Sequence, residues 1–406
     1  MTYGFGIYGR FGTSRPSWRK RLPYSKGAFL LLDQPLTRPQ AIAILIMFCF
    51  GSSAVVGVSP GVGQDAWIAL TISLLFTVPV FWIYSRIISL NPGKGFFEAT
   101  ELILGKVAGK VVTALMSWYA LHLCALVLRN FSEFIQIAAL LETPQLPVLL
   151  VMAVTVYLLA RSGCKALGKW ALATMPIVLG IMVITVLFSI PVMDPLNFLP
   201  VLEHPIGAIL KSSLQSFSFP LGETVVFLGI ADFIRPNDNP QKILLGSLGL
   251  IGVTLLLVII RNLLVLGPAM VSVTYFPSYA AVRIISLGEF ISRIEGSISI
   301  NLIVSGITKI ALSLIVASRG IASLFGIRDW RKLVAPVGFL AVMLAQILYK
   351  SSMEMFTFID HYGFYAFPFQ VALPIVLWVA SEIRARKSGG KAYERGNGMG
   401  VARQGE

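Results

Sequence analysis

The sequence predicts an all-α polytopic membrane protein with ten transmembrane helices, arranged as two halves of five. Of its 406 residues, 56% are hydrophobic and only 13% are charged, and apolar stretches long enough to cross a bilayer recur throughout. Helix-breaking residues interrupt the first and the sixth of these stretches. A mean hydropathy of +0.79 excludes a water-soluble domain of this length.

The ten expected helices follow from these apolar stretches, each close to the roughly 20 residues that a transmembrane helix needs. We expect them at residues 40–58, 65–90, 109–138, 146–161, 168–190, 207–231, 240–262, 294–318, 333–350 and 366–384. The fourth, fifth and ninth are almost entirely aliphatic, which indicates that they face lipid.

Basic residues predict the orientation and the two tails. With both termini in the cytoplasm, most connecting lysines and arginines lie on the cytoplasmic side, and Arg261, Arg283 and Arg293 are the exceptions. Nine of the fourteen net positive charges come from the chain ends. We assign this excess to topology and to attraction by membrane lipid, and we expect no nucleic acid partner.

Three regions are expected. Residues 1–37 form a basic, disordered cytoplasmic tail without the features of a signal peptide. Residues 38–385 form the membrane domain, and residues 386–406 form a disordered cytoplasmic tail.

Enzymatic chemistry has little support in the sequence. The three histidines lie in separate segments without carboxylate or cysteine neighbours in a catalytic spacing. The three cysteines have no spacing typical of a disulfide framework or a metal site. We therefore expect no enzyme, no cofactor and no bound metal.

The third expected helix carries polar residues on one face. His122, Arg129, Glu133 and Gln136 are spaced so that their side chains point the same way. Because an ionisable side chain at mid-membrane costs about 3 kcal/mol, Arg129 and Glu133 either neutralise each other one turn apart or meet water. The face therefore forms an internal ion pair that joins helices, or it lines a cavity.

The eighth expected helix repeats this pattern without charge. Ser297, Asn301, Ser305 and Thr308 lie along one side. This seam either hydrogen-bonds neighbouring helices or lines a cavity. The connection before it, residues 281–293, alternates polar and apolar residues as an amphipathic interfacial helix does, and it is either a lid over an outer vestibule or an inert connector.

The sixth expected helix contains the segment SFSFPLGETVVFLGI, Ser216 to Ile230. Pro220 has no backbone N–H to donate to the preceding turn, and Gly222 tolerates unusual backbone angles, so the helix should break near Phe219. Glu223 then lies in the first turn of the second half-helix, where exposed amides favour a carboxylate. It is either a local cap or part of a ligand site, because broken backbone at membrane depth is tolerated only inside protein or beside a wet cavity.

The first expected helix holds a second irregularity, FGSSAVVGVSPG. Gly51, Ser52 and Ser53 are expected to interrupt its middle, and glycines and a proline end it. Paired interruptions in two five-helix halves are typical of inverted-repeat transporters with a ligand at the midplane. An ionised Glu223 would favour an ammonium group or a proton, and the amides near Ser52 and Ser53 could take the carboxylate of a zwitterion.

Three segments resemble the endospore germination permeases, the B-type subunits of bacterial spore germinant receptors. They are QDAWIAL from Gln64, FSFPLGETVVF from Phe217 and FPSYAAVRIISLGEFISRIEG from Phe276, and the resemblance covers about residues 36–385. It implies an amino acid–polyamine–organocation superfamily fold, like that of the leucine transporter, in the inner membrane of a spore. It also implies two partners, an A-type membrane subunit and a C-type lipoprotein subunit.

The resulting functional expectation is a receptor subunit that binds a small nutrient, an amino acid, between helices 1, 3, 6 and 8 and triggers germination. The alternative is a proton- or sodium-coupled secondary transporter of amino acids or amines. The resemblance places the unwound regions on Gly51, Ser52, Ser53, Ser218, Phe219, Gly222 and Glu223. The polar seams add Asn301 and Ser305 as ligand contacts, with His122, Arg129 and Glu133 on the polar face of helix 3.

Overall fold

The computed structural model describes residues 34–56, 59–138, 140, 142–235, 237–284 and 295–386. Both expected tails, apart from a few residues beside the membrane domain, lie outside these ranges. The second half of the expected amphipathic connection, including Glu289 and Arg293, also lies outside them. The extents of the tails and the role of that connection therefore stay predictions.

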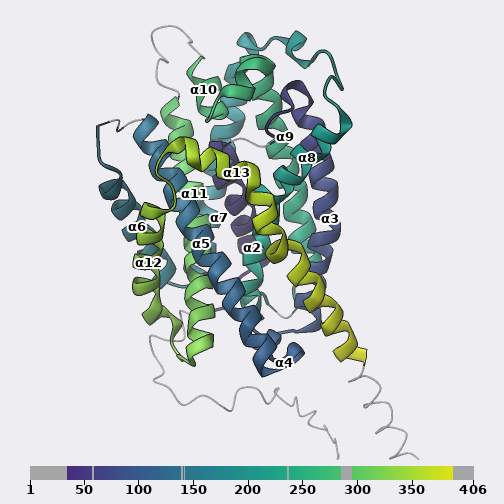
Figure 1. The fold of residues 1–406 in the computed structure, drawn as a ribbon, viewed down its shortest axis with the longest axis vertical. Helices are drawn as coiled ribbons and strands as arrows, with labels where there is room; N and C mark the ends of the chain where they lie inside the picture. The colour runs from purple at the N-terminus through teal and green to yellow at the C-terminus, as the bar shows by residue number, and fades with distance from the viewer. Residues whose placement is uncertain are drawn as a thin grey trace, which may run out of the picture.

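The described residues form a bundle of helices (Figure 1). In chain order these are α2 (Arg38–Val56), α3 (Ala66–Leu90), α4 (Phe96–Leu104), α5 (Lys106–Ala138), α6 (Gln145–Arg161), α7 (Cys164–Ser189), α8 (Ile206–Ser216), η5 (Phe217–Leu221), η6 (Gly222–Phe233), α9 (Pro240–Val273), α10 (Pro277–Arg283), α11 (Glu295–Phe325), α12 (Val334–Ile347), α13 (Ser352–Phe367) and η8 (Pro368–Ala372). The predicted all-helical membrane fold is confirmed.

Each of the ten expected spans overlaps one helix or one continuous run of helices. Eight of these runs in the described chain are long and apolar enough to cross a membrane, and Arg38–Gly51 and Gln145–Arg161 are shorter apolar helices. The number of crossings therefore stays a prediction. Apolar side chains of α6, α7 and α12, among them Val151, Ile177 and Phe339, are exposed, as expected for helices that face lipid.

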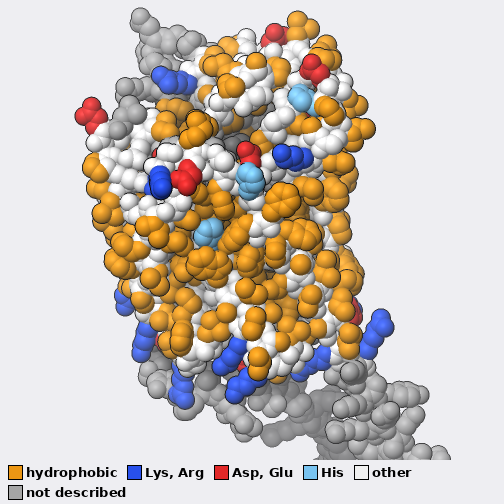
Figure 2. All heavy atoms as spheres, viewed as in Figure 1, with side chains coloured by type: hydrophobic (Ala, Val, Ile, Leu, Met, Phe, Trp, Pro, Cys, Tyr) orange, Lys and Arg blue, Asp and Glu red, His pale blue; other side chains and the backbone are white. Residues whose placement is uncertain are grey.

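Two long helices form the centre of the bundle. α11 packs against α2, α5, α6 and α7, and α2 also packs against α7 and α9. The run Ile44–Phe50 of α2 is almost completely buried. Figure 2 shows an apolar band across the middle of the face in view, and Lys and Arg side chains gather at the lower end of the molecule. We call this lower end, which includes Lys106, Lys110 and Arg161, the basic end.

The interruption of the first helix lies later than predicted. α2 runs as a continuous helix through Gly51, Ser52 and Ser53 to Val56, and where the described chain resumes, Ser59 and Gly61 have positive φ angles. Gly51 serves a different purpose from unwinding. A Cβ atom there would lie 2.9 Å from the backbone of Ser305, so the glycine allows α2 and α11 to approach closely.

Replacement of Gly51 by alanine is expected to destabilise the protein by about 1–3 kcal/mol, because one of the two central helices must move away from the other. Gly180→Ala in α7 is the matched control, since its added methyl group meets nothing within 4 Å. Thermal unfolding of both variants in detergent checks the prediction. Equal melting temperatures would contradict the close helix contact.

Two other expected helices differ at their ends. α9 continues past residue 262 to Val273, with a kink at Gly267, whose backbone angles are not helical, before Pro268. α13 begins at Ser352 rather than near residue 366, and the preceding Ser351 caps it, because its hydroxyl accepts the N–H of Glu354. Its first turns carry Asp360 and His361, and these polar residues hide the helix from a hydropathy criterion.

Candidate ligand site

The sixth span breaks at the predicted residue. α8 ends at Ser216, Phe219 has the non-helical angles φ −137° and ψ 113°, and η6 begins at Gly222. Gln370 of η8 donates to the carbonyl of Ser218 at 2.8 Å and so satisfies a backbone acceptor that the break exposes. A Cβ atom on Gly222 would lie 2.3 Å from Gln370 Oε1, so the glycine makes room for this side chain.

Glu223 is buried directly after the break, with only 1% of its surface exposed. One carboxylate oxygen accepts the hydroxyl of Tyr362 at 2.8 Å, and the other pairs with the ammonium group of Lys309. The carboxylate thus takes part in a tertiary network and is more than a local cap.

Lys309 of α11 is the functional residue that the sequence analysis missed. Its side chain is completely buried, and its ammonium group lies 4.8 Å from the ring centre of Phe48 and 5.2 Å from that of Phe219. The available signal was its position as the single basic residue within the eighth expected span, because an ionisable residue at membrane depth indicates a functional site.

The hydrogen-bonded network extends from Glu223 through three tyrosines. The hydroxyl of Tyr362 lies 3.0 Å from the hydroxyl of Tyr119. The Tyr119 hydroxyl in turn accepts a hydrogen bond from the side-chain amide of Gln370 at 2.9 Å. Tyr84 of α3 donates to the carbonyl of Gln370 at 2.6 Å. The network therefore joins α3, α5, α11 and α13 around the break, and it fixes the orientation of the Glu223 carboxylate.

A small cavity lies beside this network. It has a volume of about 20 Å³ and is bordered by α5, the break, the end of α12 and α13. We call it the central cavity; its lining consists of Leu123, Leu126, Val127, Asn130, Phe219, Glu223, Tyr349, Phe358, Ile359 and Tyr362. A cavity of this size holds about one water molecule, so a larger ligand requires movement of its walls.

A wider depression, which we call the vestibule, lies toward the end of the bundle opposite the basic end. It measures about 300 Å³, and its lining includes Ser59, Gln215, Ser216 and Asp360. Phe219, Ile359 and Tyr362 line both the vestibule and the central cavity. These three side chains, the barrier, therefore separate the two spaces.

Two of the predicted ligand contacts line the central cavity, namely Phe219 and Glu223. Ser218 and Gly222 lie in the break and contact Gln370. Asn301 donates to the carbonyl of Val178 in α7, and Ser305 donates within its own helix. Neither lines the central cavity, because the side chain of Lys309 and the tight α2–α11 contact occupy that side of the break.

Gly51, Ser52 and Ser53 also lie outside the lining of the central cavity. The Ser53 hydroxyl donates to the carbonyl of Cys49 at 2.8 Å, within α2. The side chain of Ser52 lies outside the described residues. The geometry thus keeps the third and sixth expected helices, which are α5 and the broken helix, in the candidate site. It replaces the first and eighth expected helices by α13.

The polar face of α5 divides into a structural part and a cavity-lining part. Arg129 and Glu133 form the internal ion pair at 2.8 Å, and Arg129 also donates to carbonyls at the end of α12. His122 packs against Trp118 and Tyr365, with ring centres 5.6 and 5.0 Å apart. Asn130, which the sequence analysis did not select, lines the central cavity, and its Oδ1 has no hydrogen-bond partner among the described residues.

His204 has a carboxylate neighbour that its sequence position does not reveal. Asp65 accepts the backbone N–H groups of Leu202 and His204 and lies 3.1 Å from the His204 ring. This cluster attaches the connection between α7 and α8 to the start of α3. Among the described residues, no three His, Cys, Asp or Glu side chains come together as a metal site requires.

The family model and the similar proteins of known sequence all point to spore germination proteins. A family described as "Spore germination protein" matches residues 35–355. The chain is similar to spore germination protein KB of Bacillus subtilis (strain 168), with 26% identity over 371 residues that cover 88% of this chain and 98% of that protein. It is also similar to the putative spore germination protein YfkT of the same organism, with 24% identity and coverage of 73% and 81%.

Among solved structures, the fold resembles the crystal structure of MhsT in complex with L-phenylalanine. The TM-score is 0.62, the sequence identity is 12%, and the match covers 86% of this chain and 89% of that one. MhsT has the leucine-transporter fold. At this identity the likeness concerns the fold alone, and it agrees with the predicted arrangement of two halves with a broken sixth helix.

Proposed function

Since the chain belongs to the spore germination protein family, we propose that it is the B-type membrane subunit of a germinant receptor. In this proposal it binds a small nutrient, an amino acid, beside Glu223 and thereby triggers germination. The observation that carries the proposal is a buried carboxylate at a helix break, next to a central cavity that a three-residue barrier separates from a vestibule.

The polar groups of the central cavity suit an ammonium group. Glu223 offers carboxylate lone pairs, and Asn130 offers an unpartnered acceptor on the opposite wall. The remaining lining is aliphatic or aromatic and suits a small apolar side chain. Because the cavity holds only about 20 Å³, we propose that ligand entry displaces the barrier and that this displacement is the signal.

The basic end of the bundle, which lies opposite the vestibule, is closed by direct links. The N–H of Leu36 donates to the carbonyl of Phe233 at 2.7 Å, and Arg319 binds Asp232 through two hydrogen bonds. Lys165 donates to the carbonyl of Pro35. These links join the start of α2, the end of η6 and α11, and they support a ligand that enters and leaves by the vestibule.

The second candidate function is an ion-coupled transporter of amino acids or amines, which the leucine-transporter fold favours. Within this alternative, Lys309 argues for a proton rather than sodium. A bound sodium ion would need several free oxygens, and the two oxygens of Glu223 already pair with Lys309 and accept the hydroxyl of Tyr362. Uptake of radiolabelled amino acid by the reconstituted protein distinguishes a transporter from a receptor.

The proposed setting follows from the family and the charge distribution. We place the protein in the inner membrane of the spore with the basic end and both termini in the cytoplasm. Its proposed partners are an A-type membrane subunit and a C-type lipoprotein subunit. The central cavity would then receive nutrients that have crossed the outer layers of the spore.

The direct test is thermal stabilisation of the purified protein by each amino acid in turn. We expect one or a few amino acids to raise the melting temperature of the wild type, because a ligand that binds the folded state stabilises it. Glu223→Gln should abolish this shift. Lys211→Met, at an exposed position of α8, is the control and should keep it.

A wild type that no amino acid stabilises would contradict the proposed site in the isolated subunit. A shift that survives in Glu223→Gln would remove the carboxylate from the site. If Asn130→Ala lowers the affinity and Asn301→Ala does not, the ligand lies in the central cavity rather than along the seam of α11.

A further inference from the structure

A second polar depression lies at the basic end of the bundle, far from Glu223 along the helices. It has a volume of about 800 Å³ and lies between the end of α3, the start of α9 and the end of the helical run that continues α13 through η8 to Arg386. We call it the basic-end groove. Its polar lining includes Arg86, Asp238, Asn239, Glu382 and Arg386. Nothing in the proposed nutrient site uses these residues.

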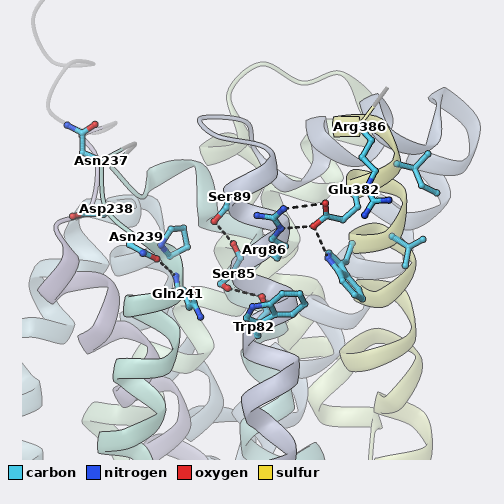
Figure 3. A pocket seen from close by; sticks show the side chains of 14 residues that line it. Trp82, Ser85, Arg86, Ser89, Asn237, Asp238, Asn239, Gln241, Glu382 and Arg386 are labelled. Atoms are coloured by element: carbon cyan, nitrogen blue, oxygen red, sulfur yellow. Dashed lines mark hydrogen bonds and ion pairs between the residues drawn. The ribbon is translucent and has the colours of Figure 1, made fainter. Parts of the chain in front are cut away.

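The charges of the basic-end groove are balanced, two arginines against two carboxylates. Figure 3 shows Arg86 and Glu382 facing each other, with Asp238 and its neighbours on the other side of the groove. Arg86 binds Glu382 through Nε at 2.6 Å and Nη2 at 3.3 Å, which leaves further guanidinium N–H groups for an added acceptor. The Oδ2 atom of Asp238 is buried and has no hydrogen-bond partner among the described residues.

The groove also has the surroundings of a membrane–water interface. Trp82 and Trp378 line it in an edge-to-face pair with ring centres 5.3 Å apart, and tryptophan is enriched at this depth of membrane proteins. Val379 and Ile383 line the groove and are exposed, and exposed apolar residues such as Val376 continue along the same helical run toward mid-membrane. A molecule with a polar headgroup and an apolar chain matches a polar groove that continues into an apolar surface.

We propose that the basic-end groove binds the headgroup of a phospholipid that carries both a phosphate and a primary amine, as phosphatidylethanolamine does. The amine pairs with Asp238, and the phosphate accepts hydrogen bonds from Arg86 and Arg386. The acyl chains lie along the exposed apolar residues of α13. A purely anionic headgroup would bring its charge close to Asp238 and Glu382 without an amine to neutralise either.

This site bears on the conformational state of the bundle. Asp238 also borders an adjoining cavity of about 190 Å³ that includes Arg235 and residues of the α3–α4 connection. The groove and this adjoining cavity therefore border α3, η6, α9 and the helical run of α13, and of these α3, η6 and α13 also contribute residues to the Glu223 network. A bound headgroup would hold these helix ends together and stabilise the closed arrangement of the basic end.

The test uses the full chain in nanodiscs that contain equal amounts of phosphatidylethanolamine and phosphatidylglycerol with identical acyl chains. Lipid retained after extraction into mild detergent is measured by native mass spectrometry. We expect the wild type to retain the amine-bearing lipid roughly tenfold better, as charge-assisted hydrogen bonds predict. Asp238→Asn should remove this preference, and Arg386→Gln should weaken retention of both lipids.

Arg384→Gln is the matched control, because Arg384 lies two residues from Glu382 on the same helix but is not part of the groove lining. It should retain lipid as the wild type does. Equal retention of both lipids by the wild type, or preferred retention of phosphatidylglycerol, would overturn the proposal. An unchanged preference in Asp238→Asn would also overturn it, because the carboxylate would then play no part in selecting the amine.

Discussion

Replacement of Lys309 by methionine is expected to destabilise the folded protein by about 3–5 kcal/mol. The change removes the counter-charge of Glu223 and leaves a carboxylate in a site where 1% of its surface is exposed. Methionine has a similar length, but it also loses the cation–π contacts that the ammonium group makes with Phe48 and Phe219. Loss of the monodisperse folded species in detergent and a lower melting temperature measure the effect.

The double variant Lys309→Met with Glu223→Gln separates charge from packing. It removes both charges together, and replacing a whole buried pair by neutral groups is far less harmful than removing one partner. We expect it to recover most of the lost stability. If the single variant is as stable as the wild type, or the double variant is no better than the single one, the buried ion pair does not contribute as argued.

Replacement of Gln370 by leucine is the second large effect, a loss of about 2–4 kcal/mol. The amide of Gln370 donates to the Ser218 carbonyl and to the Tyr119 hydroxyl, and neither acceptor is exposed to solvent. Leucine fills a similar volume but leaves the carbonyl at the break without a donor. The measurement is the midpoint of denaturant unfolding, compared with that of the wild type.

Gln215→Leu is the control for this prediction. Its amide makes a single long hydrogen bond of 3.5 Å at the edge of the vestibule, so its loss should change the unfolding midpoint little. If the two variants unfold at the same midpoint, the broken backbone does not depend on Gln370, and another group must satisfy it.

Local chemistry accounts for what could be predicted from the sequence. The break at Phe219 follows from Pro220 and Gly222, whose effects act on their own turn of helix. The Arg129–Glu133 pair follows from helix periodicity alone. The lipid-facing helices follow from their uniform apolar composition. In each case the interacting residues are close in sequence, so no knowledge of helix placement is needed.

The site itself depends on which helices meet. Lys309 is 86 residues from Glu223, and only the packing of α11 against the break brings the two together. Gly51 is expected from the sequence to unwind its helix, but it is a point of close contact with α11. Glycine permits both unwinding and close packing, and only the position of the partner helix distinguishes the two. Tyr362 of α13 and Asn130 of α5 line the same cavity because α13 packs beside α5. The hydropathy pattern conceals the start of α13, so this neighbour could not be predicted.

The barrier between the vestibule and the central cavity has a quantitative consequence for a sensor. When binding requires a rare open form, the apparent dissociation constant equals the intrinsic constant divided by the open fraction. An open fraction of about one in a thousand would convert micromolar intrinsic affinity into a millimolar response. Phe219, Ile359 and Tyr362 would then set how much nutrient must be present before the protein responds, while Glu223 and Asn130 set which nutrient it is.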